Sequence, residues 1–248
     1  MIAMLGMYDM PALQGANDRF WQAIQAELGY GPDYLTRDMD FVDIWQSPDM
    51  LFAQTCGMPL RTFLHPDVTL IGTPDYGLPG VEPGYYYSAL VVRADTTEDR
   101  LANFTGRRFA YNDAMSQSGW AGPMSHLSQA GVEFSELVET GGHHASASAV
   151  AEGRADLAGL DALTWTLLCK HDPDLTANLR VIETTAPTPT LPYITAKGRD
   201  AAPIATALRM AISSLSESDR EALHLCGLVD IPVADYLAIP TPPGPHAG

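Results

Sequence analysis

The chain has few basic side chains for its size, and this shortage excludes several kinds of partner. Its 248 residues include 14 lysines and arginines against 30 aspartates and glutamates, which gives a formal net charge of −16. Nucleic acids and anionic membrane surfaces are bound through clusters of positive charge, so neither is an expected partner. A small anion is not excluded, because backbone and side-chain dipoles can hold it locally inside an acidic protein.

Cysteine is also scarce. The three cysteines, Cys56, Cys169 and Cys226, are widely spaced and form no CxxC pair. This pattern argues against a disulfide scaffold and against a zinc ribbon, and no cofactor or metal is predicted. Cys169 and Cys226 are expected to be buried thiols of the hydrophobic core.

Long apolar segments are missing too, since no run approaches the roughly 20 residues that a membrane-spanning helix needs. The opening stretch, Met1–Asp9, has no Lys or Arg before its apolar part and no small-residue cleavage pattern, so it does not resemble a signal peptide. It predicts a buried first strand. We therefore expect either a cytoplasmic chain or one whose leader was removed before this numbering began, and the initiating methionine favours the first.

The motifs of common enzyme classes are absent from the sequence. It contains no GxSxG, HExxH or GxGxxG segment and no phosphate-binding GxxxxGKS or GxxxxGKT segment. His143, His144 and Asp161 carry metal-binding side chains, but no further ligand lies at a spacing typical of a metal site. These observations predict a protein that is not an enzyme.

What the sequence does contain is an alternation of short apolar strands and amphipathic helices, which predicts an α/β fold. Phe20, Trp21, Ile24 and Leu28, for example, stand at helical spacing before Gly29. Expected strands are Ile2–Met7, Asp49–Gln54, Val68–Gly72, an unusually long one at Tyr85–Arg93, Arg107–Tyr111, Val132–Val138, Asp156–Leu160 and Leu179–Glu183.

The order of these elements predicts two lobes. The chain leaves a first lobe, builds a second α/β unit and returns through Thr184–Ile194, which suggests a two-segment hinge with a ligand cleft that closes over a small molecule. The expected boundaries are 1–88 plus 190–238 for the first lobe, 89–189 for the second, and 239–248 for a disordered tail rich in proline.

Two polar, glycine-containing loops carry the strongest functional signal. Residues 111–120 (YNDAMSQSGW) and residues 140–146 (TGGHHAS) each follow a predicted strand and precede a predicted helix. Each loop therefore places backbone N–H groups and hydroxyls at a helix N-terminus, where anions bind. Two such loops in one lobe could hold a phosphate-like group without any cation.

In order along the chain, the segments GYYYS (84–88), 109–119 ending in SQSG, 140–150 and GRADLAGLD (153–161) resemble the phosphate-, phosphite- and phosphonate-type solute-binding proteins of ABC transporters. The resemblance spans roughly residues 8 to 194. It implies a two-lobed fold like that of type II periplasmic binding proteins, capture of a small oxyanion for uptake, an ABC permease as partner, and a periplasmic location.

The resemblance also implies which residues bind the ligand. Ser116, Gln117, Ser118 and Gly119 match the main oxyanion loop, and His143 matches a ligand-facing histidine at the start of its helix. The remaining implied contacts come from other loops and are Tyr8, Tyr86 and, for a ligand that carries an amine, Asp161.

Structural alternatives remain for these residues. Ser116 and Ser118 could cap a helix, and Asp161 could cap the helix that starts at residue 162. Adjacent histidines on a helix point about 100° apart, so at most one of His143 and His144 faces a given ligand. Other functions also stay open: a heterocyclic or amino-organic ligand stacked by tyrosines, or a cytoplasmic sensor or enzyme on the same scaffold.

Overall fold

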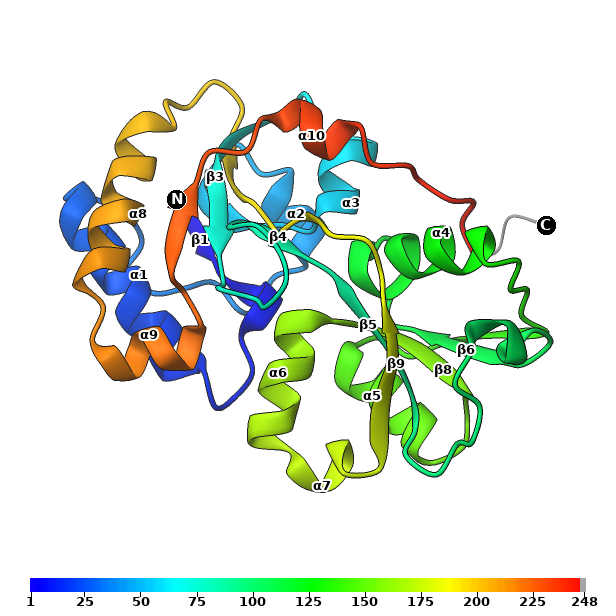
Figure 1. Ribbon diagram of the computed structural model, residues 1–248. Coiled ribbons are helices and arrows are strands. Elements are labelled where there is room, and N and C mark those ends of the chain that lie inside the picture. Colours follow the sequence, from blue (N-terminus) through cyan, green and yellow to red (C-terminus); the bar gives the residue numbers. More distant parts are fainter. Residues whose placement is uncertain (246–248) are drawn as a thin grey trace. The chain divides into compact units, whose positions relative to one another are not determined.

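The computed structural model describes residues 1–245 and divides into two compact units (Figure 1). Unit 1 comprises Met1–Tyr85 and Pro189–Ala238, and unit 2 comprises Tyr86–Thr188 and the C-terminal segment from Ile239. The chain therefore passes from one unit to the other after Tyr85, after Thr188 and a third time after Ala238. Among the described residues, no helix combines the length and the apolar character that crossing a bilayer requires.

Unit 1 contains a five-stranded sheet in the order β1-β2-β11-β3-β12. Strands β1 and β2 are parallel, whereas β11 is antiparallel to both of its neighbours and β12 is antiparallel to β3. The bounds are Ile2–Met4 for β1, Met50–Gln54 for β2, Val68–Asp75 for β3, Tyr193–Ala196 for β11 and Gly227–Val229 for β12. All five residues of β2 are buried, which explains the apolar run Met50–Ala53.

Helices of unit 1 pack their apolar faces on this sheet and on one another. In α1 (Gln14–Leu28) the buried face carries Phe20, Trp21 and Ile24, and the helix ends at Gly29, which adopts the left-handed conformation (φ 75°) that glycine tolerates best. Helix α1 packs against α8. The other helical elements are 3-10 helix η1 (Gly6–Tyr8), α2 (Phe41–Trp45), α3 (Gly57–Pro59), η2 (Leu60–Leu64), α8 (Ala202–Ser214), α9 (Glu217–Leu223) and α10 (Val233–Leu237).

Unit 2 contains the second five-stranded sheet, in the order β7-β6-β8-β5-β9. Strand β6 is parallel to β7 and β8, and β5 is antiparallel to β8 and β9. The bounds are Ser88–Arg93 for β5, Arg108–Tyr111 for β6, Glu136–Glu139 for β7, Leu157–Asp161 for β8 and Leu179–Thr184 for β9. The parallel strands β6, β7 and β8 therefore present their carboxyl ends at one edge of the sheet.

Helices connect these parallel strands and begin at that edge. The π-helical turn η4 (Gln117–Ala121) leads into α4 (Gly122–Gln129) after β6, α5 (His143–Ala151) follows β7, and α6 (Ala162–His171) follows β8. The short elements η3 (Leu101–Phe104) and α7 (Pro173–Thr176) complete the unit. The candidate residues of the two polar loops thus stand where ligands bind open α/β sheets.

The prediction of one long strand at Tyr85–Arg93 is wrong in one respect. It is divided into β4 (Tyr85–Tyr86), which pairs with β10 (Thr188–Pro189), and β5, which belongs to the sheet of unit 2. Tyr87 separates them, and its carbonyl oxygen accepts a hydrogen bond from the amide of Ala162. A continuous β-forming run cannot show that its two ends have different partner strands, because both ends carry the same kind of side chain.

The prediction of buried thiols at Cys169 and Cys226 is also wrong. Both cysteines are exposed, whereas Cys56 is buried. In α6 the buried positions include Leu163, Leu167 and Leu168, so Cys169 lies about 100° around the helix from its buried neighbour and faces outward.

The C-terminal segment has no helix or strand in residues 239–245. Within unit 2, the indole Nε1 of Trp120 donates a hydrogen bond of 3.2 Å to the carbonyl oxygen of Pro243. Residues 246–248 of the predicted disordered tail lie outside the described residues.

Candidate functional site: an anion-binding loop in unit 2

The first candidate loop joins β6 to η4, and Ser116 organises its end. The Oγ of Ser116 accepts a hydrogen bond of 2.9 Å from the amide of Gly119, which makes Ser116 the N-cap of η4. The capping role considered from the sequence is therefore present. Accepting this bond leaves the hydroxyl hydrogen as a donor, so the cap and a contact to an anion are chemically compatible.

Several backbone amides of the same turn are engaged within the turn itself. The amides of Trp120 and Ala121 bond to the carbonyl oxygen of Ser116 at 3.2 and 2.9 Å. The amides of Gln117 and Ser118 lie in the first turn of the helix, where backbone N–H groups have no helix carbonyl oxygen to donate to. Gln117 and Ser118 are 2% and 4% exposed, so this turn presents dipoles from a largely water-excluded position.

The second candidate loop meets the first through side chains and backbone. The Oγ of Ser118 lies 3.1 Å from Nε2 of His143, the first residue of α5. Thr140 Oγ1 donates to the carbonyl oxygen of Tyr111 at 2.9 Å, and the amide of Gly141 bonds to the carbonyl oxygen of Asn112 at 2.9 Å. Two loops that lie about 25 residues apart in the sequence thus form one site at two helix starts.

His143 enters this site as a neutral side chain. Although the residue keeps some exposed surface, the surrounding protein shields its imidazole, and this burial lowers the pKa of His143 from about 6.5 to about 4, with the nearby backbone of Gly159 opposing part of the effect. At neutral pH the ring therefore adds hydrogen bonding and no positive charge. A histidine with so low a pKa is also a weak general base, so the Ser118–His143 pair is poorly suited to nucleophilic catalysis.

Glycine at two positions lets the loops approach closely. A Cβ on Gly119 would lie 1.7 Å from Oδ1 of Asn112, and a Cβ on Gly159 would lie 2.3 Å from Cγ of Pro123 and 3.1 Å from the carbonyl oxygen of Ser118. Gly159 belongs to β8, so this strand passes directly beneath the anion loop.

Asn112 and Gly159 were missed as site residues by sequence reasoning. Asn112 follows β6, where a polar side chain beside a glycine-containing loop is a usable signal. Its Oδ1 is buried without a hydrogen-bond partner among the described residues. The role of Gly159 depends on contact between elements about 40 residues apart, which the local sequence does not reveal.

Asp161 is placed as the N-cap of α6. Its Oδ1 accepts a hydrogen bond of 2.9 Å from the amide of Thr164, and the residue is 2% exposed. This is the structural alternative that the sequence left open. His144 turns away from His143, and its Nε2 lies 2.9 Å from Oδ2 of Asp172.

The two tyrosines predicted as contacts are both packed side chains. Tyr8 lies in η1 of unit 1, is 9% exposed, and meets the ring of Tyr76 edge-on with the centroids 5.3 Å apart. Tyr86 is the first residue of unit 2 and is 1% exposed. The structure therefore brings Ser116–Gly119 and His143 together, and it places Tyr8 in the other unit.

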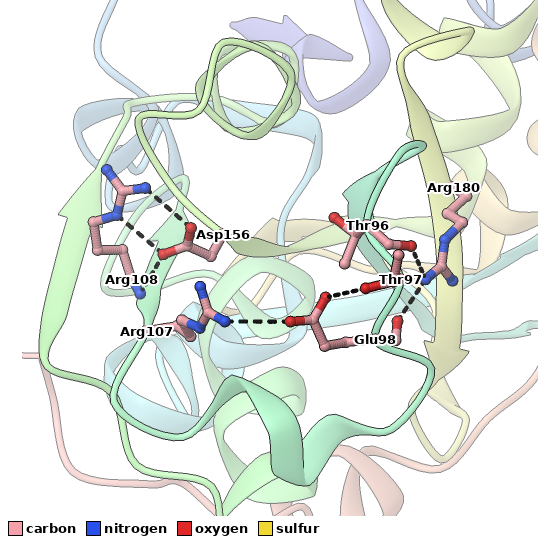
Figure 2. A network of polar contacts seen from close by, with 7 residues as sticks. All are labelled: Thr96, Thr97, Glu98, Arg107, Arg108, Asp156 and Arg180. Carbon is pink, nitrogen blue, oxygen red and sulfur yellow. Dashed lines mark hydrogen bonds and ion pairs between the residues drawn. The ribbon is translucent and has the colours of Figure 1, made fainter.

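The opposite edge of the same sheet is built from paired charges. Arg108 donates to both carboxylate oxygens of Asp156 at 3.0 Å, and Arg107 Nη2 lies 3.3 Å from Oε1 of Glu98; both pairs are drawn in Figure 2. Arg180 bonds to the carbonyl oxygens of Thr96 and Glu98. A polar cavity of about 310 Å³ is lined by Arg107, Arg108 and Asp156 of this network and by Arg93, which is paired with Asp95. Because its guanidinium groups already have partners, this network holds the loop after β5 against the sheet.

Comparisons with known proteins agree with the fold. A comparison with curated protein sequences gave no significant match. Solved structures that resemble this one include PhnD1 from Prochlorococcus marinus in complex with methylphosphonate (TM-score 0.73, 18% identity, 95% of this chain and 93% of that chain covered). A binding protein component of an ABC phosphonate transporter from Pseudomonas aeruginosa has a TM-score of 0.71 at 18% identity, with 95% and 82% covered. A Xanthomonas citri protein bound to ATP has a TM-score of 0.68 at 16% identity, with 92% and 91% covered.

At these identities the structural likeness shows the fold, which is that of the two-lobed type II periplasmic binding proteins. The predicted fold class is thereby confirmed. The sequence itself matches the family described as "ABC transporter, phosphonate, periplasmic substrate-binding protein" over residues 64–235, more than half of the chain. This chain therefore belongs to the phosphonate-type periplasmic substrate-binding proteins of ABC transporters.

Proposed function

We propose that this chain captures a small phosphorus oxyanion and delivers it to an ABC permease in the periplasm. The single observation that carries the proposal is the 3.1 Å contact between Ser118 Oγ and His143 Nε2, which joins two helix N-termini into one donor site. Membership of a phosphonate-binding family supports the class of ligand. Because His143 is neutral and its low pKa makes it a weak base, the pair is suited to binding and not to catalysis.

The donor set fits an anion in spite of the acidic protein. Hydroxyls of Ser116 and Ser118 and the first-turn amides offer hydrogen bonds that become short and charge-assisted when the acceptor is an oxyanion. Exposed carboxylates that lie more than about 10 Å from the site are largely screened by salt at ordinary ionic strength. The local dipoles therefore decide whether the anion binds.

Phosphonate, phosphite and phosphate share a tetrahedral phosphorus that bears at least three oxygens, so the same donors suit all three. Methylphosphonate is bound in the Prochlorococcus marinus protein. We propose an alkylphosphonate as the preferred ligand of this chain, with phosphite and phosphate as weaker ones. In the proposal, Tyr8 and Tyr86 also contribute to ligand binding.

Asp161 has a narrower part in the proposal. Its Oδ1 is engaged in capping α6, so a role toward the ligand is restricted to compounds that carry an amine. Replacing Asp161 with Asn should then weaken binding of an aminophosphonate more than binding of methylphosphonate. Equal losses for the two ligands would leave Asp161 with its capping role alone.

A thermal-shift screen followed by calorimetry tests the function. Methylphosphonate, phosphite, phosphate, sulfate and an aminophosphonate are each added to the full chain, since a ligand that binds only the folded state raises the melting temperature. The double variant Ser116→Ala/Ser118→Ala should lose the shift, whereas the control Ser128→Ala, on the exposed side of α4, should keep it. A double variant that binds as tightly as the parent would show that both serines serve only the fold.

A further inference from the structure

Two hydroxyl groups of the loop at residues 140–146 form a short hydrogen-bonded chain. Oγ1 of Thr140 lies 2.9 Å from the carbonyl oxygen of Tyr111 and 3.2 Å from that of Gly142. It also lies 2.7 Å from Oγ of Ser146, which is 0% exposed. A carbonyl oxygen can only accept a hydrogen bond, so Thr140 donates to a carbonyl oxygen and Ser146 donates to Thr140.

Burial fixes this direction of the two hydroxyl bonds. If Thr140 donated to Ser146 instead, the hydroxyl hydrogen of Ser146 would be buried without an acceptor among the described residues, which is costly. The hydrogens of both hydroxyls are therefore engaged inside the protein. Neither side chain has a hydrogen left to donate to an oxyanion, although both belong to a loop whose sequence suggests such contacts.

The hydroxyl chain lies where two parallel strands end. Tyr111 is the last residue of β6 and is paired with the last residue of β7. Directly beyond this pair, the amide and the hydroxyl of Thr140 both bond to the carbonyl oxygen of Tyr111, and the amide of Gly141 bonds to that of Asn112. Ser146, one turn into α5, connects the start of that helix to the same point. The two loops therefore leave the sheet side by side.

We propose that Thr140 and Ser146 are positioning residues that set the separation of the two helix starts, at η4 and α5, without touching the ligand. The proposal rests on the proposed function, because it takes the two loops as one oxyanion site. Loss of the hydroxyl chain would let the start of α5 shift and would lengthen the 3.1 Å contact between Ser118 Oγ and His143 Nε2. Donors displaced from their productive geometry bind an anion more weakly.

Substitutions at Thr140 provide the first test. Thr140→Val keeps the shape of the side chain and removes the hydroxyl, so calorimetry should show roughly tenfold weaker binding of methylphosphonate. Thr140→Ser restores the hydroxyl and should bind within about twofold of the parent. The matched control, Thr166→Val, removes a hydroxyl bond of 2.9 Å to the carbonyl oxygen of Ala162 in the same unit and should leave the dissociation constant unchanged. A Thr140→Val variant that binds as tightly as the parent, or an equal loss in Thr166→Val, would overturn the proposal.

Ser146→Ala is a milder variant that tests the order of the chain. It leaves the bonds from Thr140 to the carbonyl oxygens in place, so we expect only a roughly two- to fourfold loss of methylphosphonate affinity. In the Thr140→Val background the same change should cost nothing further, because the acceptor of the Ser146 hydroxyl is already gone. Additive losses would show that Ser146 acts independently of Thr140 and would overturn the hydroxyl chain.

NMR titration of His143 judges the positioning role without any ligand. The pKa of His143 is about 4 because the surrounding protein shields the imidazole. If Thr140→Val lets the loops part, water reaches the ring and its pKa should rise toward about 6.5, whereas Thr166→Val should leave it unchanged. An unchanged pKa in Thr140→Val would overturn the positioning role. A raised pKa would support it even if the parent binds no phosphorus oxyanion, in which case only the proposed function fails.

Discussion

The two edges of the sheet in unit 2 differ in their polar groups: one carries ion pairs and the other carries neutral hydrogen-bond donors. At the edge where β6 and β8 begin, guanidinium groups such as that of Arg108 are matched with carboxylates such as that of Asp156. At the edge where these strands end, hydroxyls and helix amides around Ser118 meet a neutral His143. Paired ions satisfy one another and hold the fold, whereas neutral donors can bind an anion without adding a fixed charge. A count of arginines alone would favour the other edge for an anion site.

The largest effect should come from Ser118→Ala. Bonds to a charged acceptor are worth about 1.5–3 kcal/mol each, so loss of this hydroxyl should weaken oxyanion binding roughly 10- to 100-fold. Arg107→Ala at the other edge should change the dissociation constant less than about twofold. Calorimetric titration of both variants compares the edges directly, and a greater loss in Arg107→Ala would reverse the assignment.

Gly119→Ala should come next, because the added Cβ would lie 1.7 Å from Oδ1 of Asn112 and must displace the loop or the asparagine. We expect about a tenfold loss of oxyanion affinity, since small misplacements of binding groups are costly. The control is Gly227→Ala, where a Cβ meets nothing within 4 Å. Combining Gly119→Ala with Asn112→Ala makes room for the Cβ, so failure of the pair to recover any affinity would refute the steric explanation.

His143 should make stability depend on pH. Its pKa is about 4 in the folded chain, and the unfolded value lies near 6.5, so between these pH values the unfolded chain binds a proton that the folded chain does not. Folding stability should fall as the pH drops from about 6.5 to about 4, by about 1–3 kcal/mol from this group. Denaturant unfolding of His143→Gln should show a correspondingly smaller decline. Matching pH profiles for variant and parent would indicate that the imidazole is not shielded.

Asp156→Asn should have the smallest effect and should leave binding unchanged. Hydrogen bonds from Arg108 lower the pKa of Asp156, so the carboxylate contributes stability at neutral pH that is lost as the pH falls below its unfolded value near 4. Both partners remain partly exposed to solvent, which limits the contribution to about 1 kcal/mol or less. Urea unfolding at pH 7 and pH 3 should show a larger difference between parent and variant at pH 7 than at pH 3, and equal differences at the two pH values would contradict this role of the ion pair.

Local patterns predicted much of this site, and contacts between distant elements account for what was missed. Ser116 and His143 could be placed at helix starts from the sequence, because capping residues and glycines mark such positions. The division of Tyr85–Arg93 between two sheets, the outward turn of Cys169 and the closeness of Gly159 to Ser118 depend on which elements pack together. The spacing of residues within one segment does not predict which distant elements that segment contacts.

A crystal structure of the full chain with methylphosphonate would test the central claim most directly. The account predicts that the phosphonate oxygens bond to the hydroxyl of Ser118, to first-turn amides of η4 and to His143, and that the arginine pairs of the opposite edge stay intact. A phosphonate bound among Arg93, Arg107 and Arg108, with the loop at Ser116–Gly119 unoccupied, would contradict it.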